Sequence, residues 1–187
     1  NSTLIDIGAN IGIYSLYAAK KNHNVLSFEP ESLNFACLNL NVSDNNLNNK
    51  IIAYPISLND TFKISNLNLM KMKFGGSGNT FDRNIHESGD QFNPEYKQGS
   101  ISVSLDNFLE INKISPNYIK IDVDGNELRV IKGMKNIIND QNLKSICIEL
   151  NPDFNEHNEV MKILENNFKS HNKHKWYEGQ NVFNYTF

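Results

Sequence analysis

The chain of 187 residues is long enough for one domain with a hydrophobic core and too short for two domains of ordinary size. Hydrophobic residues make up 39% and charged residues 21%, and the net charge of −3 provides no basic surface that would favour a nucleic-acid partner. No apolar run approaches the roughly 20 residues of a transmembrane helix, and no signal peptide is recognisable, so we expect a cytoplasmic protein that does not act at a membrane.

The first third of the chain alternates apolar runs with helical patterns. Strands are predicted at 4–7, 25–28 and 50–56, with helical spacing from Ile11 to Ala18 and from Leu33 to Leu40. This βαβαβ order predicts a parallel sheet with right-handed helical crossovers. The first strand begins almost at residue 1 and without an initiating Met, so we expect a fragment that has lost an N-terminal element.

The middle of the chain is less regular. Residues 62–72 alternate loosely between apolar and polar, as in an antiparallel hairpin added at the edge of a sheet. Residues 74–100 hold five of the ten glycines and show little periodicity. A stretch of this length without structure is usually functional or disordered. We predict that residues 74–100 form a mobile lid within one domain that spans residues 1–187.

Regular structure returns after this segment. Helices are predicted around 105–109, 127–138 and 158–168, and strands at 118–123 and 143–150. The end of the chain, HKWYEGQNVFNYTF, predicts an antiparallel hairpin around Gly179. The predicted fold class is therefore α/β: a Rossmann-like sandwich with a mostly parallel seven-stranded sheet, an antiparallel C-terminal hairpin, and a hairpin and lid inserted after the third strand.

The stretch LIDIGANIGIYS places a glycine-containing turn between the first strand and the first helix. Such turns let a ligand approach the backbone N–H groups of a helix N-terminus. The spacing differs from the G-x-G-x-x-G of dinucleotide sites, because Asn10 lies between Gly8 and Gly12 and the third glycine is absent. Asp6 favours a ligand with positive charge, such as the ammonium and sulfonium of S-adenosylmethionine (SAM). The alternative is a plain βα turn in which Asp6 caps the helix.

Glu29 ends the second strand in the stretch LSFEP. An acidic residue about 20 positions after a glycine turn accepts hydrogen bonds from the ribose hydroxyls of an adenosine ligand. Nicotinamide and SAM sites share this feature, so Glu29 supports an adenosine ligand without selecting between the two. A carboxylate favoured by the helix dipole at the start of the next helix is the alternative explanation.

The stretch YIKIDVDGNELRVIKGM brings Asp122, Asp124 and Glu127 to the end of the fourth strand. Open α/β sheets bind ligands at such strand ends. Asp124 and Glu127 also have the spacing of a helix capping box. Asp122 interrupts an apolar strand, where a carboxylate is costly unless it has a partner. Strand alternation puts Lys120 on the same face, where it either pairs with a carboxylate or begins the strand as an exposed residue.

Five stretches, in order, carry a family resemblance: LIDIGANIGIYS, SFEPES, VSLDNFL, YIKIDVDGNELRVIKGM and ICIELNP. From Leu4 to about Pro152 they closely resemble the FkbM-type family of SAM-dependent methyltransferases. The resemblance implies a class I methyltransferase fold with SAM as methyl donor and S-adenosylhomocysteine (SAH) as product. It also implies O-methylation of a hydroxyl on a sugar or another small polar metabolite.

The resemblance extends to individual residues. The expected SAM-binding residues are Asp6, Gly8, Ala9, Asn10, Gly12, Glu29, Ser57 and Asp122. Lys120, Asp122, Gly125 and Glu127 match the family signature Lys-x-Asp-x-Glu-Gly-x-Glu, in which Asp124 replaces the usual Glu. Asn151 stands where many members carry a histidine after Glu149, which argues against a base at that position.

Methyl transfer requires the acceptor oxygen, the methyl carbon and the sulfur in line, and a base that removes the hydroxyl proton. Asp122 is the first candidate base, followed by Glu149 and Asp124. His86 is an alternative base, although a lone loop histidine is more often solvated surface. The predicted contacts to the acceptor are Arg83, His86, Lys120 and Glu127.

Other possibilities remain open at this point. The aspartates offer oxygen ligands that suit Mg²⁺, but no clear set of converging ligands accompanies them, so no metal site is predicted. A small-molecule acceptor is expected, and the oligomeric state is open, with a homodimer among the options. The alternative functions are a nicotinamide-dependent oxidoreductase, disfavoured by the absent third glycine, and a non-catalytic module that binds an adenosyl ligand.

Overall fold

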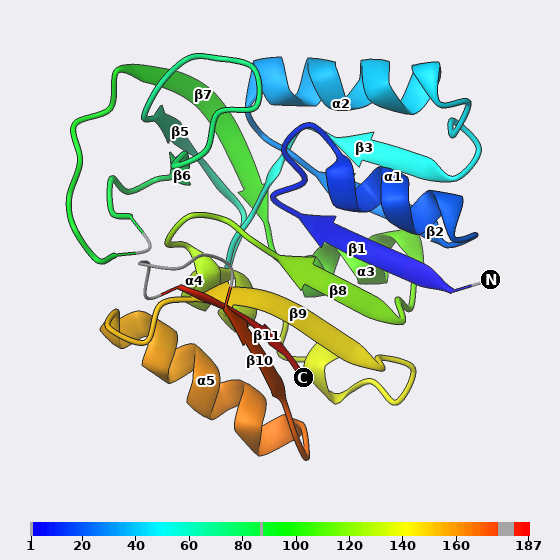
Figure 1. Cartoon of the computed structure of the whole chain (residues 1–187). Helices are drawn as coiled ribbons and strands as arrows, with labels where there is room; N and C mark the ends of the chain where they lie inside the picture. Colours follow the sequence, from blue (N-terminus) through cyan, green and yellow to red (C-terminus); the bar gives the residue numbers. More distant parts are fainter. Residues whose placement is uncertain (1, 87, 176–181) are drawn as a thin grey trace.

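The computed structural model describes residues 2–86, 88–175 and 182–187. Within these ranges a central sheet has seven strands in the order β10-β11-β9-β8-β1-β2-β3 (Figure 1). The strands are β1 (Thr3–Ile7), β2 (Asn24–Phe28), β3 (Ile51–Tyr54), β8 (Tyr118–Ile121), β9 (Ser145–Leu150), β10 (Asn172–Lys175) and β11 (Phe183–Thr186). The five from β9 to β3 are parallel, and β11 and β10 complete the sheet in antiparallel pairing. The predicted sheet and C-terminal strand pair are confirmed, while the turn around Gly179 lies outside the described residues.

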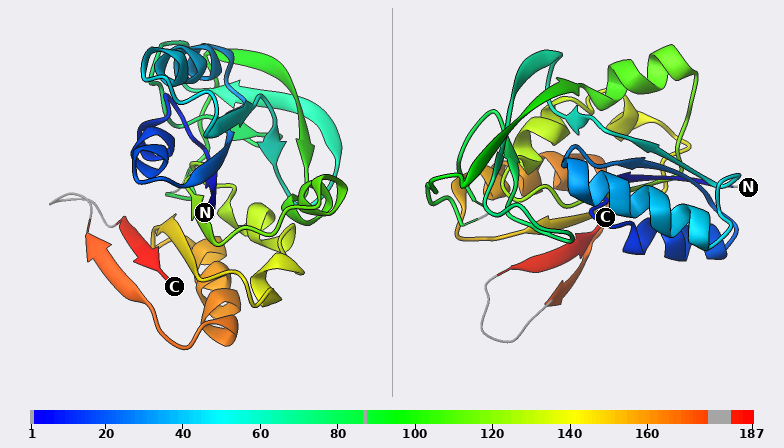
Figure 2. Two further views of the ribbon diagram at one scale, coloured as in Figure 1. Left: turned by 90° about the vertical axis from the view of Figure 1, so that its right-hand side faces the viewer. Right: turned by 90° about the horizontal axis from the view of Figure 1, so that it is seen from above.

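Helices cover both faces of the sheet (Figure 2). One face carries α1 (Ile13–Lys20) and α2 (Ser32–Asp44); the other carries α3 (Leu105–Asn112), α4 (Glu127–Lys132), the 3₁₀ helix η1 (Ile137–Asn139) and α5 (Asn155–Asn167). Strand alternation divides the core accordingly. The larger cluster, which includes Ile5, Ile119 and Ile146, packs against α3, α4 and α5, and a smaller one around Val25 and Leu38 packs against α1 and α2. No helix in the described part of the chain is long and apolar enough to span a membrane.

The two helices on the α1 face bury only some of the apolar positions that their sequence spacing predicts, such as Ala18 in α1. In α1 the buried residues are Ser15, Ala18 and Ala19, whereas Tyr17 is 65% exposed. The predicted apolar stripe of α2 from Leu33 to Leu40 is wrong, since the buried residues are Asn34, Leu38 and Val42. The rotation has a tertiary cause, because the Asn34 side chain turns inward to form hydrogen bonds with residues 75 and 76.

A second sheet of four strands lies beside the first in the described structure, in the order β4-β7-β5-β6. Its strands are β4 (Ser57–Leu58), β5 (Lys63–Leu69), β6 (Thr80–Phe81) and β7 (Tyr96–Val103). β5 and β7 pair antiparallel from Lys63–Ser102 to Leu69–Tyr96. The prediction of an unstructured stretch over 74–100 is therefore wrong in part, because residues 80–81 and 96–100 form strands whose pairing with β5 supplies backbone hydrogen bonds. The mobility of this segment stays a prediction.

Two further boundaries differ from the predictions. The helix predicted over 127–138 stops at Lys132, where Gly133 packs so closely that a Cβ atom would lie 2.1 Å from the carbonyl oxygen of Asn59. The strand predicted over 118–123 ends at Ile121. Residues 122–126 form a turn in which Asp124 and Gly125 have positive φ angles of 53° and 107°. This turn carries the acidic residues to the edge of the sheet.

Gly12 provides a test of the packing between α1 and α2. Its φ is +92°, and a Cβ atom would lie 2.3 Å from Leu38 Cδ1. We expect Gly12→Ala to lower the free energy of unfolding by about 2–4 kcal/mol, through backbone strain and overpacking. Urea denaturation followed by circular dichroism measures the change. Gly99→Ala in β7 is the matched control, because a Cβ there meets no atom within 4 Å; equal losses in both variants would contradict this explanation.

Candidate active site

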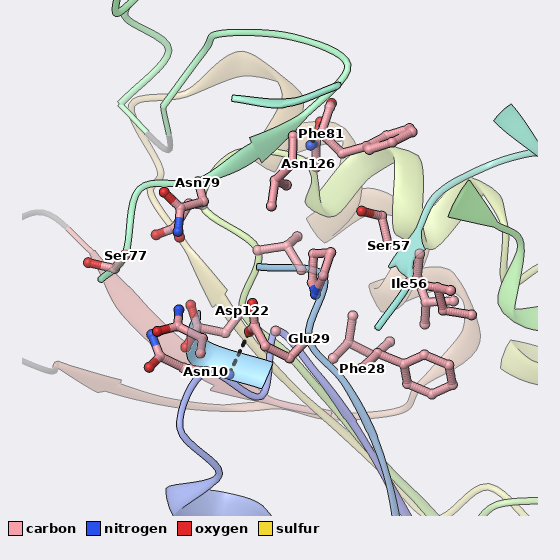
Figure 3. A pocket seen from close by; sticks show the side chains of 18 of the residues that line it. Asn10, Phe28, Glu29, Ile56, Ser57, Ser77, Asn79, Phe81, Asp122 and Asn126 are labelled. Atoms are coloured by element: carbon pink, nitrogen blue, oxygen red, sulfur yellow. Dashed lines mark hydrogen bonds between the residues drawn. The ribbon is translucent and has the colours of Figure 1, made fainter. Parts of the chain in front are cut away.

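A pocket opens at the carboxyl ends of the parallel strands (Figure 3). About 690 Å³ of space lies inside it, including the part open to solvent. Its walls contain six of the residues singled out in the sequence: Gly8, Asn10, Glu29, Ser57, Asp122 and Asp124. The apolar walls come from Phe28, Ile56, Leu58, Leu67 and Phe81. The strand ends thus gather the predicted polar residues around one cavity.

Asp6 lies beneath this pocket, not on its wall. It is fully buried on β1, where the sheet register places it between Ser27 and Lys120. The Ser15 hydroxyl donates to Asp6 Oδ2 at 2.5 Å, and Lys120 Nζ lies 3.4 Å from Asp6 Oδ1. The predicted contact between Asp6 and a cationic ligand therefore has no support in this geometry. Asp6 acts on the pocket through Lys120.

Lys120 connects the buried strands to the pocket. Besides Asp6, its Nζ lies 3.3 Å from Asp122 Oδ2 and donates to the carbonyl oxygen of Gly8 at 3.0 Å. Burial lowers the pKa of Lys120, but the two carboxylates outweigh it and raise the pKa above its usual value. The expected pairing of Lys120 with a carboxylate is confirmed. Its ammonium is committed to these partners, so the predicted contact with the acceptor stays a prediction.

The glycine turn brings β1 and β8 into close contact. At Gly8, with φ of +72°, a Cβ atom would lie 1.7 Å from the carbonyl oxygen of Asp122. The N–H groups of Gly8 and Ala9 both donate to the Phe28 carbonyl at 3.0 Å. Ala9 and Gly12 are not among the residues that line the pocket, and they pack toward α2. The turn therefore positions Asn10 and Glu29. The N–H groups of Gly8 and Ala9 are already bonded to a backbone carbonyl.

Glu29 is the most enclosed carboxylate on the pocket wall. Its two oxygens accept the backbone N–H groups of Asn10 at 2.7 Å and Glu31 at 2.9 Å, and Figure 3 draws the bond to Asn10. Burial raises its pKa to about 7, although these hydrogen bonds oppose the shift. The alternative role at the start of α2 belongs to Glu31, which accepts the N–H groups of Leu33 and Asn34. Each oxygen of Glu29 keeps a lone pair for a ligand hydroxyl.

Glu127 proves to be a buried structural residue. It accepts the N–H of Gly125 at 3.0 Å and lies 2.8 Å from His157 Nε2. Because the Asn151 N–H donates to His157 Nδ1, the histidine proton sits on Nε2 and is donated to Glu127. Burial raises the pKa of Glu127, but His157 and the backbone N–H groups outweigh it and hold the pKa below its usual value. Glu127 is 2% exposed, and its predicted contact with the acceptor stays a prediction.

The three candidate bases lie together, in different surroundings. Asp122, Asp124 and Glu149 line a small gap between the ends of β8 and β9. Asp124 Oδ2 accepts the N–H of Gly78, so it forms a hydrogen bond across the pocket. The Asp122 side chain is 39% exposed and lines the main pocket. Asp122 therefore has the best access to a bound ligand.

The first part of the predicted lid crosses the pocket and is bonded to its rim. Asn34 accepts the Gly75 N–H at 2.8 Å and donates to the Gly76 carbonyl at 2.9 Å. Asn10 donates to the same carbonyl at 3.0 Å. With the bond from Gly78 to Asp124, residues 75–78 are attached to α2, to the glycine turn and to the β8–α4 turn.

The remaining predicted acceptor residues lie away from the pocket wall. The Arg83 guanidinium lies 2.9 Å from a carboxylate oxygen of Glu156 and donates to the Gly125 carbonyl at 2.9 Å. The His86 ring packs against Phe92, with 4.5 Å between ring centroids. Within the described ranges, no group of three or more His, Cys, Asp or Glu side chains is arranged to hold a metal ion.

Sequence reasoning missed His157 and Asn34. Both act through partners at least 30 residues away, so no local spacing indicates them. The proximity of Asn34 to Glu31 at the start of α2 is the one local signal. It marks the helix cap, without showing that Asn34 bonds to residues 75 and 76.

The Lys120 contacts generate a stability prediction. Lys120→Met leaves the buried Asp6 carboxylate without its cation, and we expect the free energy of unfolding to fall by about 3–5 kcal/mol in urea denaturation. Adding Asp6→Asn removes the uncompensated charge and should restore a large part of the loss. Lys132→Met is the control, because its ion pair with Glu159 is exposed and contributes about 1 kcal/mol or less. A double variant as unstable as the single one would contradict the charge explanation.

Comparisons with known proteins agree with this architecture. Residues 6–172 match the family model described as Methyltransferase FkbM domain. The hexuronic acid methyltransferase AglP of Haloferax volcanii is 28% identical over 157 residues, which are 80% of this chain and 56% of AglP. Methyltransferase FkbM from Methylobacillus flagellatus KT superposes with a TM-score of 0.66 at 15% identity, covering all of this chain and 44% of that one. The N-terminal domain of human METTL16, solved in complex with SAH, gives a TM-score of 0.53 at 15% identity and covers 99% of this chain and 60% of that one.

The chain thus spans about half the length of AglP and of the Methylobacillus protein. The two solved structures, both under 25% identical, show a shared fold, and the expectation of a Rossmann-like class I methyltransferase fold is confirmed. The family model covers most of the sequence. The chain belongs to the FkbM methyltransferase family.

Proposed function

We propose that the protein transfers a methyl group from SAM to a hydroxyl of a small polar acceptor, with sugars as the favoured class. One observation carries the proposal: the pocket wall presents Glu29 and Asp122 together, at the ends of β2 and β8. The first carboxylate is enclosed and suits a pair of ribose hydroxyls. The second is open and suits a proton acceptor. Family membership and the SAH complex of METTL16 support SAM as the methyl donor.

The pocket fits SAM along its length. Glu29 accepts the ribose hydroxyls with the lone pairs that Asn10 and Glu31 leave unused. The apolar side chains Phe28, Ile56 and Leu58 provide a surface for a flat heterocycle. Asp122 lies beside Asn10 and Glu29 on the pocket wall and can offset the positive charge of the methionine part (Figure 3).

The chemistry assigned to the protein is positioning and proton transfer. SAM supplies a methyl group that is already activated by the sulfonium. Asp122 would take the proton of the acceptor hydroxyl as the oxygen forms its bond to the methyl carbon and the bond between that carbon and sulfur breaks, which leaves SAH. Lys120 Nζ lies 3.3 Å from Asp122 Oδ2 and holds that carboxylate in place. Residues 75–78 cover the pocket and limit the access of water.

The acceptor is the least defined part of the proposal. AglP is a hexuronic acid methyltransferase, and its 28% identity to this chain makes sugar hydroxyls the first class to test. The net charge of −3 favours a small acceptor over a nucleic acid. Glu149 and Asp124, which share the gap beside Asp122, are the next candidate bases.

The first test measures binding and transfer with the purified chain. Isothermal calorimetry should detect SAH binding and no binding of NAD, and labelled SAM should methylate a member of a panel of sugars and uronic acids. Binding of NAD alone would favour an oxidoreductase. Binding of SAH without transfer to any acceptor would favour a non-catalytic module.

Asp122→Asn tests the base. General base catalysis contributes about 10²–10⁴-fold, so we expect the single-turnover rate at saturating SAM to fall by roughly 100-fold or more. Asp60→Asn is the matched control, because Asp60 is exposed and does not line the pocket. A rate that is unchanged in Asp122→Asn would remove this residue from the mechanism.

The raised pKa of Glu29 generates a pH prediction. Protonation near pH 7 converts one carboxylate oxygen into a donor, so we expect the affinity for SAH to rise between about pH 6 and pH 8. Glu29→Gln should bind SAH roughly 10- to 100-fold more weakly and lose this pH dependence.

The stability of the protein without ligand should change with pH in the opposite direction. The unfolded chain releases the Glu29 proton at a lower pH than the folded chain does, so Glu29 lowers the free energy of unfolding as the pH rises toward 7. Calorimetry and denaturation across this pH range measure both effects.

A further inference from the structure

Two buried polar atoms on the pocket wall lack a hydrogen-bond partner. Asn126 is 5% exposed and Ser57 is 4% exposed, and both line the pocket. Neither Asn126 Oδ1 nor Ser57 Oγ has a hydrogen-bond partner among the described residues. Buried polar side chains are nearly always paired, so two exceptions on one pocket wall call for a ligand that pairs with them.

The hydrogen bond of the Asn126 amide nitrogen determines the orientation of the whole amide group. Asn126 Nδ2 donates to the carbonyl oxygen of Phe81 at 3.1 Å. Flipping the amide would break this bond and place two oxygens against each other. The Asn126 oxygen is therefore the atom that remains for a ligand, and an amide oxygen only accepts hydrogen bonds. The site requires an N–H or O–H donor at this position.

The surroundings of Asn126 define the chemistry of that donor. Figure 3 shows Asn126 and Phe81 along one side of the pocket, Ser57 at its end, and Glu29 and Asn10 on the opposite side. The nearby walls include Leu58, Leu67 and Phe81, which are apolar. A charged ammonium favours carboxylates over such walls. A neutral N–H or O–H donor on a largely apolar group suits these walls, and the exocyclic amino group on the purine ring of SAM is such a donor.

We propose that Asn126 selects the 6-amino purine ring of the methyl donor by accepting a hydrogen bond from its exocyclic amino group. This inference rests on the proposed function and adds a specificity determinant to the same pocket. A 6-oxo purine would place an oxygen against Asn126 Oδ1, with both atoms buried. Such a ligand is rejected because two acceptors face each other without a proton between them.

Ser57 contributes affinity without selecting the ring. A hydroxyl donates or accepts by rotation, so Ser57 Oγ can pair with a ring nitrogen, an amino group or an oxo group. The two residues therefore predict different mutant behaviour. Loss of Asn126 removes discrimination between amino and oxo rings, whereas loss of Ser57 weakens both ligands to a similar extent.

The role of Asn126 is not visible in the sequence. It occupies a position between Gly125 and Glu127 that the family signature leaves open. It also lies at the start of α4, where an asparagine is expected to cap the helix. In the structure Asn126 is the N-cap residue but makes no side-chain cap bond, since its amide turns to Phe81 and the pocket.

The test compares two ligands by calorimetry: SAH and its deaminated counterpart S-inosylhomocysteine, which carries a 6-oxo purine. The wild-type chain should bind SAH at least about tenfold more tightly. Asn126→Leu should bring the ratio of the two dissociation constants close to one. Ser57→Ala is the matched control and should weaken both ligands while keeping the wild-type ratio. The ratio is measured on folded protein, so a general loss of stability leaves it unchanged.

Asn126→Ser is a second variant in case the leucine variant does not fold, and its rotatable hydroxyl should also abolish the selectivity. A wild-type ratio near one overturns the inference even without variants. A ratio that survives in both Asn126 variants overturns it as well. If SAH binds and the ratio does not depend on Asn126, the proposed function stands without this inference. Failure of the wild-type chain to bind SAH overturns both.

Discussion

One buried ammonium group holds the pocket together. Lys120 reaches from the middle of β8 to the carboxylates of Asp6 and Asp122 and to the carbonyl oxygen of Gly8. These partners come from the end of β1, from the glycine turn and from the turn after β8. A carboxylate as deeply buried as Asp6 is unfavourable without a cation, so the charge on Lys120 is required for this arrangement of strand ends. The close approach of Gly8 to the Asp122 backbone follows the same constraint.

This arrangement separates structural and ligand-facing carboxylates. Asp6 and Glu127 are enclosed: Asp6 accepts a hydrogen bond from Ser15 and pairs with Lys120, and Glu127 is bonded to His157 and to backbone N–H groups. Glu29 and Asp122 lie on the pocket wall with capacity for a ligand. Acidic residues that look alike in the sequence thus differ in role, because burial and local partners decide which oxygens remain available.

The fold was largely predictable from short-range pattern. Apolar runs of four to six residues alternate with helical segments, and the order of the strands follows from the parallel crossovers. Glu29 and Asp122 were identifiable because a polar residue at the end of an apolar strand marks the ligand-binding edge of such a sheet. The sequence did not indicate the surroundings of Asp6. A direct contact with a cationic ligand was expected, whereas the Asp6 side chain points toward Ser15 and Lys120.

The parts that sequence pattern missed depend on distant partners. β7 lay inside the predicted lid because its partner β5 lies about 30 residues earlier and much of the strand is exposed, so no apolar period marks it. The phase of α2 was wrong because Asn34 is buried by its bonds to residues 75 and 76. The roles of His157 and Asn126 were missed for the same reason. Each forms its side-chain hydrogen bond with a residue of another helix or strand, His157 with Glu127 and Asn126 with Phe81.

The attachment of residues 75–78 has a kinetic consequence. A ligand that enters beneath this segment must first break the bonds to Asn34, Asn10 and Asp124. At about 1 kcal/mol for each attachment point, the open form would be on the order of one molecule in a hundred. Entry and departure of the ligand are then both slowed by this opening equilibrium, which lengthens the lifetime of the complex without changing the ratio of the two rates. The amide side chain of Asn34, which lies outside the reacting centre, would thereby set part of the turnover time.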